Sequence, residues 1–129
     1  MKYLLDNCVY LWIITNNQKK ISKKVTEILN DDNEFYISII SQIETTVKHA
    51  KHHISGLDRP IIEYYQKYSL SSGINFLNLS QEDVEVLHKL PNIHQDPFDR
   101  LLVCQAISNG MTIISPDEKF SEYPVRVIY

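Results

Sequence analysis

Short apolar runs alternate along the chain with longer stretches in which apolar residues recur every three or four positions. The short runs predict buried strands at 3–5, 35–38, 74–77, 111–114 and 124–128. The longer stretches predict helices over 8–14, 21–30, 39–54, 59–70, 80–90 and 97–109, and one helical turn over 117–120. This alternation predicts an α/β fold, with a central parallel sheet of about five strands between two layers of helices.

One segment in the last third of the chain carries the clearest local signals. Asp96 is expected to cap a helix, with Pro97 at its first position and Asp99 at its third. Gly110 is expected to end that helix in the left-handed conformation. Asp117 then follows the next predicted strand after a proline break. Acids therefore stand at the ends of several well-marked elements.

Asp99 occupies an unusual position on the predicted helix. A helical projection places Arg100, Gln105, Ser108 and Asn109 on one polar face. Asp99 lies nearly opposite the middle of that face, on the side that should turn inward. A buried acid is costly unless something neutralises or solvates it, so this position is the first indication of a functional site.

Two further acids also stand at element ends, and each has a local explanation. Asp6 directly follows the first predicted strand and is a natural cap for the helix after it. Glu44 belongs to the pattern Ser41-x-x-Glu44, which fits a capping box, and it is also spaced to pair with Lys48. Taken alone, these structural roles explain both acids better than catalysis does.

The topology nevertheless brings these acids toward one place. In an open parallel sheet the strand carboxyl ends and many helix amino ends gather along one edge, where ligands bind. Helix amino ends stabilise each charge by only about 0.3–1 kcal/mol, which is too little to offset mutual repulsion in a partly dry crevice. An all-carboxylate set favours Mg²⁺ or Mn²⁺ over zinc. The expected ligands are Asp6, Glu44, Asp99 and Asp117.

Composition limits the alternatives. At 129 residues, with 43% hydrophobic and 22% charged residues, the chain is expected to form a single domain over 1–129. The net charge of −3 gives no general indication of a nucleic-acid partner. With only 3 glycines there is no Gly-rich phosphate loop, which disfavours a nucleotide-triphosphate enzyme. Cys8 and Cys104 lack metal-ligand spacing and are expected to be buried thiols in a reducing compartment.

The amino-terminal apolar run is interrupted at once by an acid, so no signal peptide is expected. No run approaches the roughly 20 apolar residues of a membrane span. We expect a soluble, cytoplasmic protein with no membrane partner.

Two basic segments remain open to more than one interpretation. They contain Lys19, Lys20, Lys23 and Lys24, and Lys48, His49, Lys51, His52 and His53. A solvated surface is the simpler interpretation of both, and contact with a phosphate backbone is the alternative. A zinc site is disfavoured because His49 and His53 share a helix face while His52 lies well away from it.

Four sequence blocks together resemble the PIN-domain family, and within it the VapC-type toxins of bacterial toxin–antitoxin pairs. The blocks are Leu4-Leu5-Asp6-Asn7 with Leu11-Trp12, Ile37-Ser38-x-x-Ser41-x-x-Glu44, His94-Gln95-Asp96-Pro97-Phe98-Asp99-Arg100-Leu101-Leu102, and Gly110-Met111-Thr112-Ile113-Ile114-Ser115-x-Asp117. They span nearly the whole chain in the family's order, and the Asp-Pro-Phe-Asp-Arg block is the most specific.

The resemblance implies a metal-dependent ribonuclease that uses Mg²⁺ or Mn²⁺. It places Asp6, Glu44, Asp99 and Asp117 on the family's acidic positions, with Glu44 binding metal directly or through water. It also implies an RNA substrate, a small antitoxin partner that covers the site, and a homodimer.

The resemblance assigns supporting positions as well. Asp96 falls on an extra acid of this subgroup and is a further candidate metal ligand, and Ser115 falls on a small hydroxyl position near the site. Asn7 stands where threonine is common, which alters a hydrogen bond behind the ligands. The histidine-rich segment replaces a Gly-Lys turn of the family, so its role stays open.

Two other functions remain as alternatives. A catalytically inactive PIN-like module would bind RNA or a partner protein without cleaving anything, although the complete acidic set argues against it. A phosphotransfer domain would carry its phosphoryl group on a strand-end acid such as Asp6. That function needs a lysine at a later strand end, and the sequence shows none there.

Overall fold

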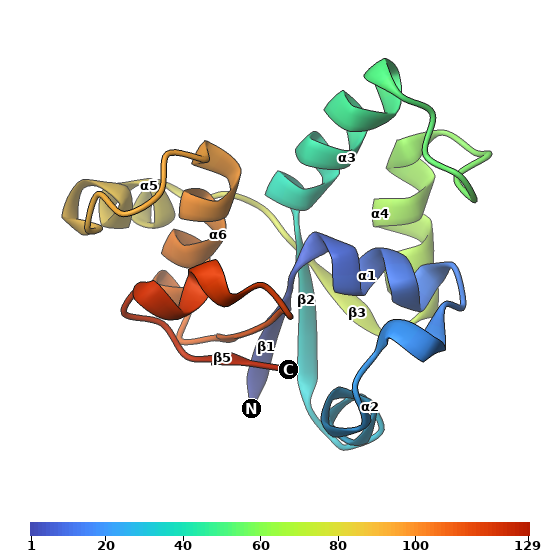
Figure 1. The fold of residues 1–129 in the computed structure, drawn as a ribbon, viewed down its shortest axis with the longest axis horizontal. Helices are drawn as coiled ribbons and strands as arrows, with labels where there is room; N and C mark the ends of the chain where they lie inside the picture. The colour runs from blue at the N-terminus through green and yellow to red at the C-terminus, as the bar shows by residue number, and fades with distance from the viewer.

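The computed structural model describes residues 1–129 and contains one five-stranded sheet with the strand order β3-β2-β1-β4-β5 (Figure 1). All neighbouring strands pair in parallel. The strands are β1 Lys2–Leu5, β2 Glu34–Ser38, β3 Ile74–Leu77, β4 Thr112–Ile114 and β5 Val127–Ile128. The predicted parallel α/β sheet is confirmed.

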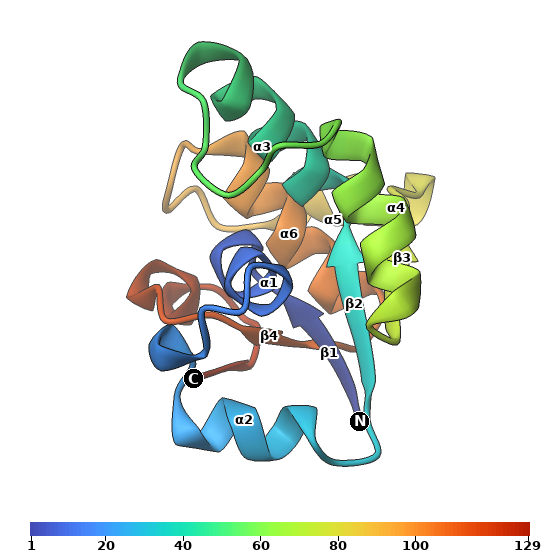
Figure 2. The same cartoon turned by 90° about the vertical axis from the view of Figure 1, so that its right-hand side faces the viewer.

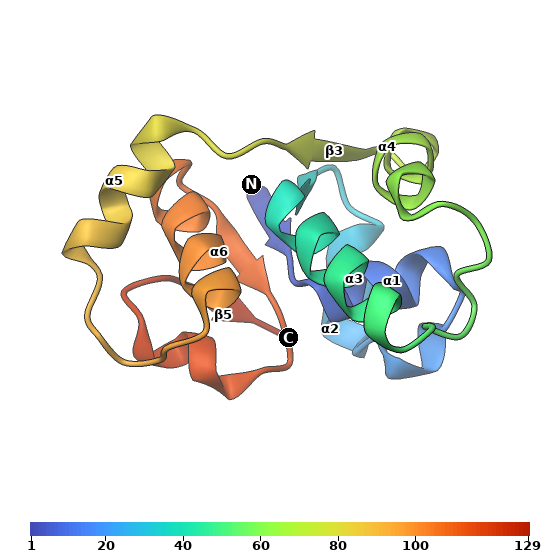
Figure 3. The ribbon, with the colours of Figure 1, turned by 90° about the horizontal axis from the view of Figure 1, so that it is seen from above.

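Helices cover both faces of this sheet, as predicted. They are α1 Asn7–Ile14, α2 Lys23–Leu29, α3 Ile39–Lys51, α4 Ile61–Ser71, α5 Gln81–Lys89 and α6 Pro97–Ser108, with 3₁₀ turns η1 Gln18–Lys20 and η2 Glu118–Glu122. Seen from above, α5 and α6 lie on one side of β1, and α1 and α4 lie on the other (Figure 3). None of these helices has the length and apolar character needed to cross a membrane.

The central strand divides the core into two clusters. Side chains of a strand alternate between the two faces of the sheet. Tyr3 and Leu5 accordingly pack with the side chains of α1 and α4, whereas Leu4 packs with those of α6 and η2. All three side chains are buried. Both clusters consist of apolar side chains, so the site forms at an edge of the sheet and not on either face.

The strand register decides which residues meet at that edge. Leu5 of β1 pairs with Ile37 of β2 and with Ile114 of β4, so these three strands end level with one another. The residues that follow them, Asp6 and Ser115 among them, therefore share the carboxyl edge. Figure 2 shows β1 and β2 running toward α1 and α3, with α2 at the opposite end of the sheet.

The first two strands pass into their helices without a loop, and the residue at each junction is the cap. Asp6 Oδ1 accepts a hydrogen bond from Asn7 N at 2.7 Å, and Ser38 Oγ accepts one from Ile40 N at 2.9 Å. The predicted capping box at Ser41 is therefore wrong. The helix begins at Ile39, which leaves Ser41 inside its first turn with its hydroxyl buried and unpartnered.

Helix α6 begins and ends as predicted. Asp96 accepts a hydrogen bond from Phe98 N at 2.9 Å, Pro97 is the first helical residue, and Gly110 has a φ of +64°. The predicted polar face is wrong at one residue, because Gln105 is fully buried. Its amide donates to Asn78 O at 3.3 Å, since α5 and the loop before it cover that face of α6.

Several predicted elements are shorter in the structure, and for two of them the structure shows the reason. The predicted strand 124–128 forms ladder pairs only at Val127 and Ile128, because its partner β4 has just three residues. The predicted helix 39–54 ends at Lys51, where His52 adopts an extended conformation. The backbone N–H of Ile54 then donates to His49 Nδ1 at 3.1 Å, which folds the chain back across the helix end.

Candidate active site

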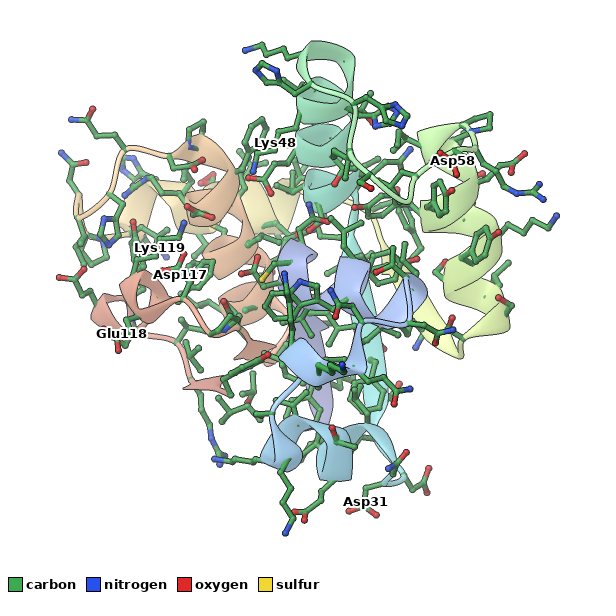
Figure 4. The ribbon with its side chains drawn as sticks, turned by 45° about the vertical axis from the view of Figure 1, so that its right-hand side comes forward. Asp31, Lys48, Asp58, Asp117, Glu118 and Lys119 are labelled. Atoms are coloured by element: carbon green, nitrogen blue, oxygen red, sulfur yellow. The ribbon has the colours of Figure 1, made fainter.

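A cavity of about 460 Å³ opens at the carboxyl edge of the sheet. The structure brings four of the predicted acids into its lining from four separate segments of the chain. These are Asp6, Glu44, Asp99 and Asp117. Two lysines, Lys48 of α3 and Lys119 of η2, also line the cavity. Figure 4 shows Lys119 beside Asp117, and Lys48 on α3.

Asp6 and Asp117 are linked by a serine hydroxyl. Ser115 Oγ donates to Asp6 Oδ2 at 2.6 Å and accepts a hydrogen bond from Asp117 N at 3.1 Å. Ser115 itself is buried, so its hydroxyl is held in this geometry. The hydroxyl of Ser115, the residue after β4, therefore orients the Asp6 carboxylate and also holds the backbone of Asp117.

Asp99 is the most buried of the four acids, with 6% of its surface exposed. Burial raises the pKa of Asp99 to about 6, and the neighbouring Asp96 adds to the rise, while Lys119 opposes it. Lys119 Nζ lies 2.7 Å from Asp99 Oδ2. The third position of α6 thus holds a carboxylate that is costly to ionise, as its place on the inward face predicted.

Asp117 is more exposed than Asp99, and its pKa is shifted in the opposite direction. It caps η2 by accepting a hydrogen bond from Lys119 N at 3.1 Å, and its other oxygen lies 3.0 Å from Lys119 Nζ. Although burial works against the charge, these contacts with Lys119 lower the pKa of Asp117. Burial also opposes the lysine charge, yet the two carboxylates raise the pKa of Lys119 above its ordinary value. The Lys119 side chain therefore stays protonated and positively charged.

Glu44 reaches the cavity from the second turn of α3. Its carboxylate lies 3.5 Å from Lys48 Nζ, which confirms the predicted pairing one turn apart. The glutamate side chain is 17% exposed, against 65% for Lys48. Glu44 therefore faces the cavity while Lys48 stands at its rim.

A buried hydrogen-bond network lies directly behind Asp6 and Glu44. Asn7 Nδ2 donates to Thr45 Oγ1 at 2.7 Å, and the Tyr65 hydroxyl contacts both Thr45 and Asn7. Asn7 and Thr45 are the chain neighbours of the two acids. The network therefore ties α1, α3 and α4 together at the floor of the site.

Asp96 is the one predicted ligand that does not line the cavity. It is exposed and caps α6. Its negative charge acts on Asp99 from outside the pocket.

Two residues of the site were not anticipated in these positions. Cys8 was expected to be fully buried, but it is only half-buried and lines the cavity, with its thiol 3.6 Å from Asp6 Oδ2. Burial, reinforced by Asp6, raises the pKa of Cys8 to about 12, so the thiol stays protonated. Lys119 was missed as a site residue, because the helical turn predicted over 117–120 gives no indication that its lysine faces the acids. Its only sequence signal is its position two residues after Asp117.

The position of Lys119 shows that one expectation from the sequence, that no lysine stands at a later strand end, was wrong. A lysine does reach the carboxyl edge, from the turn after β4, so the stated reason against phosphotransfer does not hold. Lys119 pairs with Asp99 and Asp117, however, and not with Asp6, the proposed phosphoryl acceptor. Asp6 is instead engaged by Asn7, Cys8 and Ser115.

The chemistry of the lining fits a hard divalent cation. The acids supply only oxygen donors, which Mg²⁺ and Mn²⁺ prefer. Asp99 Oδ2 is buried and lies 2.7 Å from the Lys119 ammonium, so a metal that binds this oxygen would meet the ammonium there. No three His, Cys, Asp or Glu side chains are already arranged around one metal position. Binding would therefore require the carboxylates to converge.

Fold and site together define a parallel α/β domain with an acidic pocket where the central strands end. The profile of the PIN domain matches residues 3–125, and the chain belongs to the PIN-domain family. No curated protein matches the sequence.

Solved structures with the same fold include several toxin–antitoxin complexes. VapBC2 from Rickettsia felis, bound to a DNA fragment from its promoter, has a TM-score of 0.72 at 18% identity, covering 99% of this chain and 98% of that one. A toxin–antitoxin complex from Klebsiella pneumoniae has a TM-score of 0.63 at 21% identity, covering 98% and 96%. VapBC-1 from nontypeable Haemophilus influenzae has a TM-score of 0.62 at 16% identity, covering 99% and 97%. At these identities the likeness establishes the fold.

Proposed function

We propose that the protein is an Mg²⁺- or Mn²⁺-dependent endoribonuclease and the toxin of a toxin–antitoxin pair. The observation that carries this proposal is the convergence of Asp6, Glu44, Asp99 and Asp117 on one cavity of a PIN domain. Residues 1–129 act as a single catalytic unit in this proposal, in the cytoplasm where RNA is available.

Each acid has a separate part in the proposed reaction. Asp6, Asp99 and Asp117 would hold the metal, and Glu44 would complete the shell directly or through water. When bound, the metal supplies Lewis-acid activation of a water and neutralises the charge that develops on the phosphodiester. Ser115 keeps Asp6 oriented through its 2.6 Å hydrogen bond. The products would carry a 5′-phosphate and a 3′-hydroxyl.

An RNA substrate is compatible with the net charge of −3 because bound metal reverses the local charge of the pocket. Lys48 is 65% exposed at the cavity rim, and the histidine-rich end of α3 follows it. We propose that this rim binds the phosphate backbone, so the affinity for RNA should fall as salt rises.

The proposed protein partner is a small antitoxin, and the chain itself is proposed to form a homodimer. Toxin–antitoxin complexes among the solved structures of this fold support the antitoxin. The outer face of α3 also supports a protein contact, because Ile43 and Val47 are each 42% exposed beside a shallow apolar groove. Light scattering should give twice the 15.1 kDa chain mass for the isolated protein. A purely monomeric chain would contradict the homodimer.

The test of the enzyme uses purified protein and labelled single-stranded and structured RNA with Mn²⁺, with Mg²⁺ and with excess chelator. We expect cleavage only with a divalent ion, and none in folded Asp6→Asn protein. Asp31→Asn is the matched control, because Asp31 is exposed on the turn after α2, far from Asp117 and Lys119 (Figure 4). Cleavage that persists in chelator, or full activity of folded Asp6→Asn, would contradict the metal mechanism.

The RNA assay and a separate labelling experiment distinguish the alternative functions. RNA binding without cleavage under every metal condition would favour a catalytically inactive binding module. Labelling of Asp6 by a small phosphoryl donor would favour phosphotransfer, for which the contacts of Lys119 give no support.

A further inference from the structure

The side chain of Lys119 enters the cavity between two of its acids. Its ammonium lies 2.7 Å from Asp99 Oδ2 and 3.0 Å from Asp117 Oδ2. These acids come from α6 and from the start of η2, so the lysine joins segments on either side of β4. The other lysine of the cavity, Lys48, pairs only with Glu44 on its own helix.

We propose that Lys119 is a resident cation that competes with the divalent metal for Asp99 and Asp117, so that the metal binds only as the lysine leaves. This inference rests on the metal site of the proposed function. It adds that the chain lowers its own metal affinity through one side chain.

The first argument is that the two cations need the same oxygen. Asp99 is buried, so its charge requires a neutralising partner. The oxygen that Lys119 contacts is the buried Oδ2, which has no well-aligned hydrogen bond from any other group. A metal coordinated to that oxygen would lie within a few ångströms of the ammonium, where two positive charges repel. The metal and the ammonium would therefore compete for Asp99 Oδ2.

The second argument is that Lys119 can leave without unfolding the turn. Its backbone N–H donates to Asp117 Oδ1 at 3.1 Å, which anchors its main chain independently of the ammonium. Its side chain is 34% exposed and ends a flexible four-carbon stem, so a route to solvent exists. The absence of any preformed set of three ligands is consistent with this arrangement, because Lys119 and not a metal now holds Asp99 and Asp117.

The test is Mn²⁺ binding measured by calorimetry without RNA. We expect Lys119→Met to bind Mn²⁺ at least about tenfold more tightly than the natural sequence, a difference of about 1.4 kcal/mol. Lys48→Met removes the other positive charge of the cavity and frees only Glu44, which lies 3.5 Å from the ammonium, so its affinity for Mn²⁺ should rise less than about threefold. Lys67→Met, on the exposed surface of α4, should not change it.

Equal or weaker Mn²⁺ binding by folded Lys119→Met would overturn the competition. An equal gain in Lys48→Met would also overturn it, because the gain would then not be specific to Asp99 and Asp117. Lys119→Gln replaces the first variant if the methionine protein does not fold. Loss of Mn²⁺ binding in every variant, including the natural sequence, would overturn the inference together with the metal site.

A second measurement uses the natural sequence. Mn²⁺ should increase acetylation of Lys119 by an amine-specific reagent at least about threefold relative to Lys67, as read by mass spectrometry, because displacement frees the ammonium. Unchanged reactivity at saturating Mn²⁺ would contradict displacement. Neither readout uses RNA, so a chain that binds Mn²⁺ but cleaves nothing would refute the enzyme and leave the competition intact.

Discussion

Replacing Asp99 by asparagine should stabilise the metal-free protein while weakening its response to metal. Asp99 is 6% exposed, and burial raises its pKa from 3.8 to about 6 in spite of the adjacent Lys119. The folded protein therefore resists ionising a carboxyl that ionises freely in the unfolded chain. Asparagine keeps the size of the side chain but removes the charge that must be buried.

The magnitude follows from linkage. At about 1.36 kcal/mol for each pH unit, the pKa difference between folded and unfolded states amounts to about 3 kcal/mol. The pKa of Asp99 is higher in the folded state than in the unfolded state, so the folded state favours the protonated carboxyl. The stability that this carboxyl contributes is therefore complete below pH 3.8 and is lost as pH rises through about 6. We expect Asp99→Asn to be more stable than the natural sequence by about 1–3 kcal/mol at pH 7.5 and by much less at pH 4.

The assay is urea unfolding with a chelator present at pH 4, 5.5 and 7.5, followed by the same series with saturating Mn²⁺. Metal stabilises the folded state by an amount that grows with the logarithm of its affinity, so Mn²⁺ should raise the stability of the natural sequence more than that of Asp99→Asn. The difference in unfolding free energy between the two proteins should therefore become smaller or change sign when Mn²⁺ is added. A variant less stable than the natural sequence at pH 7.5 in chelator would refute the argument that Asp99 is a strained, buried charge.

Three further substitutions test the supporting structure. Tyr65→Phe leaves Asn7 Oδ1 without its tyrosine donor, so the unfolding free energy should fall by about 1–3 kcal/mol in urea; an unchanged value would mean that water replaces the hydroxyl. Ser115→Ala removes the donor to Asp6, so Mn²⁺ affinity or RNA cleavage should fall about 10–100-fold, and normal values would show that the hydroxyl does not orient the acid. Gly110→Ala meets no clash but must hold a φ of +64°, which should cost about 1 kcal/mol in urea without changing cleavage; a neutral result would refute the conformational requirement.

Local sequence patterns were sufficient for most of the architecture. Apolar runs marked the strands, and polar residues just before the predicted helices marked the caps, as Asp6 and Asp96 show. These features depend on neighbours within a few residues, which the sequence states directly. The rule that parallel strands end at one edge was enough to predict that distant acids should meet there.

Predictions failed where a residue's surroundings come from a distant segment. Gln105 looked exposed on its own helix, but α5 and the preceding loop cover it. Ser41 looked like a cap, but the strand continues straight into the helix and Ser38 takes that place. For Gln105, the packing around the helix was not visible in the helix's own sequence. For Ser41, two serines three residues apart offered alternative helix starts, and the pairing of β2 with β3 as far as Ser38 selected the earlier one.

By itself, the sequence determined the alternation of strands and helices, the helix caps and the gathering of acids at one end of the sheet, because each follows from short-range chemistry and chain direction. Only the tertiary structure decided that Asp96 stays outside the cavity and that Lys119 enters it between Asp99 and Asp117. Those two placements depend on how α6 and η2 pack against the end of β4. Such contacts join residues from different elements, and no helical or strand repeat in the sequence connects them.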